Sequence, residues 1–121
     1  MPEIRSYRGL LVWRQAVDLA VTVYGCTRAW PKDELYGLTS QARRAGTSVA
    51  ANIAEGYGRE NRGSYVQFLK IAQGSLKELE THFVIAHRIG IARKADVESV
   101  LQQCESVGKL LRALIRKLPA A

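Results

Sequence analysis

Apolar residues recur along most of the chain at steps of three and four positions, the spacing of one face of a helix. Four segments carry this pattern, over about residues 12–29, 38–55, 64–89 and 96–117, and none of them shows the alternation of a strand. The connections between them are short, and short connections make neighbouring helices antiparallel. The pattern therefore predicts an all-α, antiparallel up-and-down four-helix bundle in a single domain, residues 1–121.

The third segment has the most regular spacing. Its apolar positions alternate four- and three-residue steps, which is a heptad seam and is typical of near-parallel helix packing. The expected seam is Tyr65, Leu69, Ala72, Leu76, Leu79, Phe83 and Ala86. By the same spacing, the expected apolar face of the first segment is Trp13, Ala16, Val17, Ala20, Val23 and Tyr24.

Residues with known helix-end preferences predict the boundaries. Pro31 stops the first helix, because proline disfavours helix in the residue before it. Gly56 stands where a left-handed closing residue is usual, and Gly90 ends the third helix. Ser64 and Gln67 fit the S-x-x-Q capping box at the start of the third helix.

The sequence lacks the residue patterns of catalytic and metal sites. Di-iron bundles need Glu-x-x-His pairs, and none occurs. Glu78 and His82 are offset from the seam, so we expect both to face solvent, and His82 and His87 are too far apart around a helix to share a metal. Cys26 and Cys104 form no CxxC pair, and we interpret them as small, reduced, apolar residues. We predict a protein that is not an enzyme and that needs no metal or cofactor.

The charge balance favours polyanionic partners. The 121 residues include 18 Lys and Arg against 11 Asp and Glu, a formal net charge of +7. Each basic side chain by itself fits an ordinary solvated surface, but several recur at helical spacing or bracket the second connection. The candidate nucleic-acid-binding residues are Arg59, Arg62, Lys70, Lys77, Lys109, Arg112 and Arg116.

A polar ridge follows the second segment beside its apolar face. It consists of Gln41, Arg44, Ser48, Asn52 and Glu55. Two interpretations remain open for this ridge: a solvated face, or an oligomer interface in which Arg44 and Glu55 make hydrogen bonds. The many small residues of this helix, such as Ala45 and Ala50, favour close approach by another helix.

Four ordered blocks resemble a known family, the bacterial four-helix-bundle proteins that include the 23S rRNA intervening-sequence protein. They are also similar to the accessory variability determinant of diversity-generating retroelements. The blocks are Leu11–Ala16, Tyr36–Ala45, Asn52–Arg59, and Phe68-Leu69 together with Gly74–Glu80. The resemblance implies a homopentamer with a central channel, a basic surface that binds RNA or DNA and, in the retroelement branch, a reverse-transcriptase partner. It implies no catalytic residues.

Two functions follow for this chain. The first is a basic oligomeric module that binds nucleic acid through phosphate contacts, and the alternative is a homo-oligomeric scaffold for a protein partner. We expect a soluble, cytoplasmic protein. The longest charge-free stretch, Ala45–Ala54, is too short to cross a membrane, so no membrane partner is expected.

Overall fold

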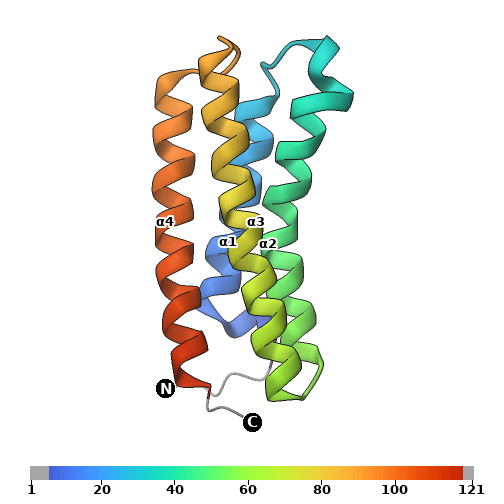
Figure 1. Ribbon diagram of the computed structural model, residues 1–121, viewed down its shortest axis with the longest axis vertical. Coiled ribbons are helices and arrows are strands. Elements are labelled where there is room, and N and C mark those ends of the chain that lie inside the picture. The colour runs from blue at the N-terminus through green and yellow to red at the C-terminus, as the bar shows by residue number, and fades with distance from the viewer. Residues whose placement is uncertain (1–5, 119–121) are drawn as a thin grey trace.

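Four long helices form the protein. The computed structural model describes residues 6–118, and its helices are α1 (Leu11–Thr27), α2 (Ser40–Gly58), α3 (Arg62–Arg88) and α4 (Lys94–Lys117). They run lengthwise with alternating direction (Figure 1). Each helix packs against the next, and α4 also packs against α1, which closes the bundle. The predicted all-α four-helix arrangement is confirmed.

The predicted seam of α3 lies in the core. Leu69, Leu79 and Phe83 are fully buried, Tyr65 at the start of the seam is half-buried, and the remaining seam residues are also buried. Burial of large aliphatic and aromatic side chains is the main stabilising contribution to such a bundle. The heptad spacing therefore identified the core-facing stripe of α3 correctly.

The predicted apolar face of α1 is partly wrong. Its buried stripe is Val12, Ala16, Leu19, Val23 and Thr27. Val23 and Tyr24 are about 100° apart around a helix, so both cannot face the core. Tyr24 is exposed, and its ring lies under the guanidinium of Arg43, at 4.8 Å from Cζ to the ring centroid.

Gly56 does not close α2. It is helical and buried, and α2 continues to Gly58. A Cβ atom at Gly56 would lie 2.7 Å from Cβ of Phe68 and 3.3 Å from the carbonyl oxygen of Tyr65. Glycine is needed here because α2 and α3 approach closely, not because the backbone turns. The chain turns only afterwards, through Glu60 with a φ of 56°.

Asn61, not Ser64, caps α3. The Asn61 side-chain oxygen accepts a hydrogen bond from the backbone N–H of Ser64 at 3.0 Å, so Ser64 and Gln67 already lie inside the helix. Asparagine is as good an N-cap as serine, and Asn61 is the first residue that can reach the free N–H groups. At the other end, α3 ends at Arg88, close to the predicted end at Gly90, and Gly90 has a φ of +87°, the left-handed conformation that glycine adopts easily.

The connection between α1 and α2 contains two further turns, η2 (Lys32–Glu34) and η3 (Leu35–Thr39). Gly37 departs from helical geometry, and the Glu34 carboxylate accepts a hydrogen bond from the N–H of Leu38 at 3.1 Å. These turns delay the start of α2 to Ser40, two residues after the predicted start.

Candidate functional site

A shallow groove of about 640 Å³ runs between α3 and α4. Lys77 from α3 and Arg112 from α4 both line it, together with the carboxylates of Glu80 and Glu105, over a floor that includes Cys104. Gly74 and Gly108 contribute no side chains, which leaves space between the two helices. The groove therefore brings together one basic candidate from α3 and one from α4.

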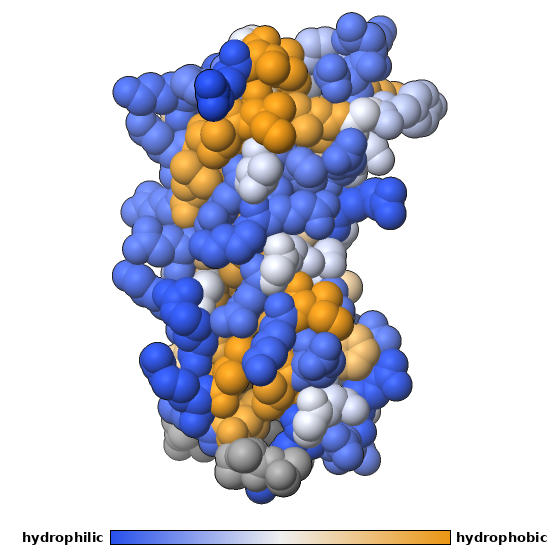
Figure 2. Space-filling model, viewed as in Figure 1, coloured by the Kyte–Doolittle hydropathy of each residue, from blue (hydrophilic) through white to orange (hydrophobic). Residues whose placement is uncertain are grey.

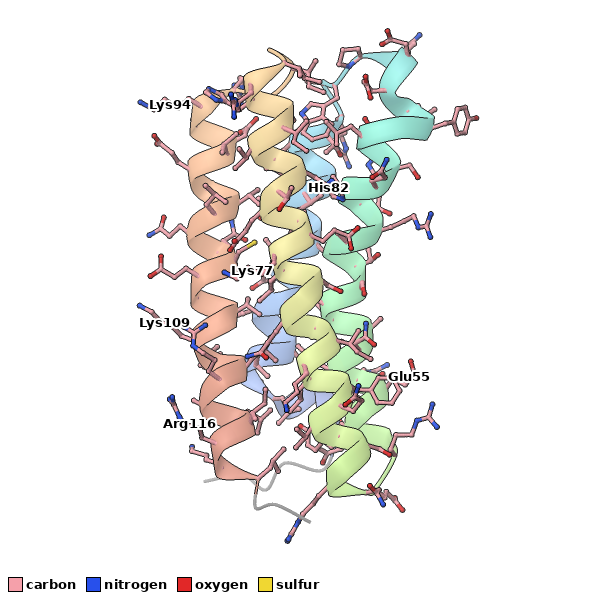
Figure 3. The ribbon with its side chains drawn as sticks, in the orientation of Figure 1. Glu55, Lys77, His82, Lys94, Lys109 and Arg116 are labelled. Carbon is pink, nitrogen blue, oxygen red and sulfur yellow. The ribbon has the colours of Figure 1, made fainter. Side chains whose placement is uncertain are left out.

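The other basic candidates are exposed around this groove or at the α2–α3 connection. Lys109 and Arg116 point outward from α4, while Lys77 projects from α3 on the side of α4 (Figure 3). Lys70 lies two turns before Lys77 on α3 and is exposed. Hydrophilic side chains cover most of this face, between two hydrophobic areas nearer its ends (Figure 2).

Carboxylates of the same chain pair with three of the candidates. Arg59 contacts Glu55 at 3.0 Å, Lys77 contacts Glu80 at 3.3 Å, and Lys109 contacts Glu105 at 3.4 Å. Such exposed pairs contribute about 1 kcal/mol or less, so a phosphate can replace the carboxylate at small cost. Within residues 6–118, no ion pair is found for the remaining candidates, which are Arg62, Lys70, Arg112 and Arg116.

The polar ridge of α2 divides into two parts. Ser48 shares a hydrogen bond of 2.9 Å with Ser75 of α3, and the Asn52 amide donates to Ser48 Oγ at 2.9 Å. These groups hold α2 against α3 within one chain. The other ridge residues, Gln41, Arg44 and Glu55, are exposed, and Glu55 is already paired with Arg59 of its own chain.

A second groove, of about 610 Å³, lies on the other side of α3, between α3 and α2. Its lining is mostly polar and includes Gln41, Arg44 and Glu78. Tyr36, from the turn before α2, also lines it and is 95% exposed. No role was predicted for Tyr36 from the sequence, although an aromatic residue just before a helix and outside every apolar stripe is a usable signal.

His82 is buried, contrary to the expectation that it faces solvent. It is only 8% exposed, and its Nε2 lies 3.2 Å from Oε2 of Glu78, which is exposed as expected. The small residues of α2, such as Ala42 and Ala45, let α3 approach closely, and this contact covers a second stripe of α3 beside the seam.

The thiols are unsuited to nucleophilic chemistry. Burial raises the pKa of the Cys104 thiol to about 12, and burial followed by the nearby charge of Asp96 raises the pKa of Cys26, which is half-buried. Residues 6–118 contain no group of three or more His, Cys, Asp or Glu placed to hold a metal ion. In the same residues, no helix combines the length and apolar character needed to span a bilayer.

Comparison with known proteins decides the family. Residues 8–113 match the family model described as 23S rRNA-intervening sequence protein. The chain belongs to this family. The resemblance found in the four sequence blocks is thereby confirmed.

A solved structure of the family has the same fold. It is a protein of unknown function from the S23 ribosomal protein family of Bacteroides thetaiotaomicron VPI-5482, at 23% sequence identity and a TM-score of 0.81. The match covers 88% of this chain and 96% of that one. At this identity the likeness establishes the fold of the family member described here and nothing about its activity. No curated protein is similar enough to the chain to count as a relative.

Proposed function

We propose that this family member is a non-catalytic, homo-oligomeric module that binds nucleic acid through phosphate contacts along the α3–α4 groove. The observation that carries the proposal is that Lys77 and Arg112, from different helices, line the same groove. Lys70, Lys109 and Arg116 extend this basic surface on the outer faces of the two helices. With a formal net charge of +7, the whole chain attracts polyanions to it.

The contacts proposed are to phosphates rather than to base edges. The basic side chains lie on exposed helix faces, where they can meet a backbone of regularly spaced charges. If all five residues of this surface contact phosphates, the logarithm of affinity should fall with the logarithm of salt concentration with a slope of about −3.5 for single strands and about −4.5 for duplex. Little dependence on base sequence is expected.

Charge reversal tests the proposal. Lys109→Glu, Arg112→Glu and Arg116→Glu are combined in one variant, and binding to labelled RNA and DNA is measured by fluorescence anisotropy over a salt series. Each lost phosphate contact should reduce the slope by about one, so this variant should bind far more weakly. Far-UV circular dichroism checks that it remains helical.

A matched control separates this surface from net charge alone. The control variant reverses Lys32, Arg88 and Lys94, which are exposed in or beside the connections at the opposite end of the bundle from Arg116, and it changes the net charge equally. We expect it to retain most of the affinity. Equal losses in the two variants, or unchanged binding by the first, would refute the assignment to the α3–α4 surface.

A second function, a homo-oligomeric scaffold that binds a protein partner, is favoured by a different surface. A groove of about 670 Å³ between α1 and α2 is lined mainly by apolar and small residues, among them Val17, Val21, Gly25 and Ala50. Val21 is 66% exposed. Exposed apolar grooves of this kind are typical of sites where another protein chain packs.

Val21→Lys tests the second function, because it places a charge in the apolar groove at an exposed position where folding tolerates it. Light scattering of the wild-type protein and the variant measures the oligomer, and co-purification after nuclease treatment measures a protein partner. Loss of the oligomer or partner in the variant supports the scaffold. A wild-type protein that stays monomeric at high concentration and recovers no partner contradicts it.

A further inference from the structure

Tyr36 is the most exposed large hydrophobic side chain of the described residues, at 95%. An aromatic ring left in water forgoes the stabilisation that burial of its apolar surface would give. The aromatic pairs of residues 6–118 do not include this ring: they join Tyr7 to Trp13, Trp30 to Phe83, and Tyr57 to Tyr65. The fold therefore gives no reason for an aromatic side chain at this position.

The carboxylate of Glu34 holds the turn that carries Tyr36 in place. The Glu34 carboxylate accepts the N–H of Leu38, which closes the turn around Tyr36. A Cβ atom at Gly37 would lie 3.0 Å from Oε1 of Glu34, so glycine makes room for this carboxylate. The exposed ring thus stands on an ordered backbone, and little conformational entropy is lost when a ligand packs against it.

The groove beside the ring has the polar groups that a nucleotide requires. The Arg44 guanidinium is exposed and has no ion pair among residues 6–118, so it is available to a phosphate. The Gln41 amide lines the same groove and can both donate to and accept from the edge of a base. Glu78 lines it too; its Oε2 lies 3.2 Å from Nε2 of His82, so its Oε1 is the oxygen that can accept from a base. At about 610 Å³ the groove lies within the usual size of ligand sites.

The two grooves are neighbours across one helix. Lys77 lines the α3–α4 groove, and the next residue, Glu78, lines the α2–α3 groove. A helix with its side chains is about 10 Å wide, so they are separated by a distance that one or two nucleotides can cross. A strand held by its phosphates in the first groove can therefore place a base in the second.

We infer that the α2–α3 groove is a site for an unpaired nucleotide of single-stranded RNA or DNA, with the base stacked on Tyr36 and its phosphate bound by Arg44. The inference rests on the proposed function and adds to it a preference for unpaired bases. Stacking on an aromatic side chain reads any base, since every base has a π face. Duplexes keep their bases stacked inside and gain nothing from the site.

A second copy of the chain is the other occupant to consider. Interfaces between identical chains are more apolar than the rest of the surface. The α2–α3 groove has a mainly polar lining, whereas the apolar groove of this molecule lies between α1 and α2. The chemistry of the site favours a nucleotide over a protein surface.

The test compares three labelled probes of equal length by fluorescence anisotropy: single-stranded oligouridine, an abasic strand with the same phosphates, and a duplex. Tyr36→Ala should weaken binding to oligouridine about tenfold, the loss of one stack, and leave the abasic and duplex probes unchanged. Tyr36→Phe should bind as the wild type does. Leu11→Ala, which truncates an exposed apolar side chain that lines none of the three grooves, serves as the matched control.

Several results would overturn the inference. Equal losses on all three probes, or no loss on oligouridine, would show that no base stacks on Tyr36. A change in mass by light scattering for Tyr36→Ala would show that the ring contacts a second copy instead. If the reversal of Lys109, Arg112 and Arg116 abolishes binding while Tyr36→Ala has no effect, only this inference fails; if the wild type binds none of the probes, the proposed function fails with it.

Discussion

Replacement of Gly56 by alanine is the sharpest test of how α2 and α3 pack. In most helix interiors this change stabilises a protein, because alanine is favoured over glycine by about 1 kcal/mol. Here the added Cβ would lie 2.7 Å from Cβ of Phe68, 3.2 Å from Cδ1 of Tyr65 and 3.3 Å from the Tyr65 carbonyl oxygen. Two of these three atoms are fixed to the backbone of α3, so a side-chain rotation cannot relieve the contact, and the helices must separate.

The two effects have opposite signs, and their sizes decide the outcome. Overpacking of a well-filled core costs typically 1–3 kcal/mol, and the closeness of backbone-fixed atoms places Gly56 near or above the upper end of that range. After subtraction of the gain in helix propensity, we expect Gly56→Ala to lower the free energy of unfolding by about 2 kcal/mol. For a chain of 121 residues this corresponds to a fall of about 8 °C in the melting temperature.

Gly74→Ala is the matched control. Gly74 lies in the middle of α3, is exposed, and a Cβ there would meet nothing within 4 Å, so only the propensity gain remains. It should raise the free energy of unfolding by up to about 1 kcal/mol. Urea unfolding followed by circular dichroism, at one protein concentration for all variants, measures both changes. A Gly56→Ala variant as stable as the wild type would refute the close approach of the two helices.

Three further predictions concern single contacts. Asn61→Ala should lower the free energy of unfolding by about 1 kcal/mol through loss of the α3 cap, and Asn61→Ser should restore most of it; equal unfolding midpoints for all three proteins would exclude the cap. Ser48→Ala and Ser75→Ala, singly and together, should give a coupling energy of about 1 kcal/mol in a double-mutant cycle, while strictly additive effects would contradict their hydrogen bond. Burial raises the pKa of Cys104 from 9.0 to about 12, so the unfolded chain loses this proton first and stability should fall as the pH rises through this window. Cys104→Val should show a shallower loss between pH 9 and 12 than the wild type in urea unfolding, and identical pH profiles would count against a buried thiol.

The sequence predicts the helices well and their ends less well, for a physical reason. The seam of α3 consists of large apolar residues at regular spacing, and only a core-facing helix satisfies such a pattern. A glycine at the end of an apolar run is compatible with two structures: a left-handed residue that ends the helix, or a helical residue where a second helix approaches closely. Gly90 is the first and Gly56 the second, and the difference depends on Phe68, whose position across the bundle is a property of tertiary packing.

The candidate site, too, was predictable from the sequence only in part. Exposure of the basic residues followed from their offset from the apolar stripes, and all seven candidates are exposed. That Lys77 and Arg112 line one groove depends on the register between α3 and α4, which spacing within each helix does not contain. Tyr36 was missed because it stands out only by its exposure, at 95%. Apolar spacing predicts which residues are buried, but it does not predict which aromatic residues remain exposed.

One turn of α3, residues 76–79, contributes side chains to the core and to both grooves. Successive helical residues are about 100° apart, so four consecutive side chains point to different surroundings. Leu76 and Leu79 are buried in the core, Lys77 lines the groove toward α4, and Glu78 lines the groove toward α2. The positions of both polar side chains are therefore set by the leucines on either side of them. The proposed binding surfaces depend on the same heptad spacing that packs α3 into the core.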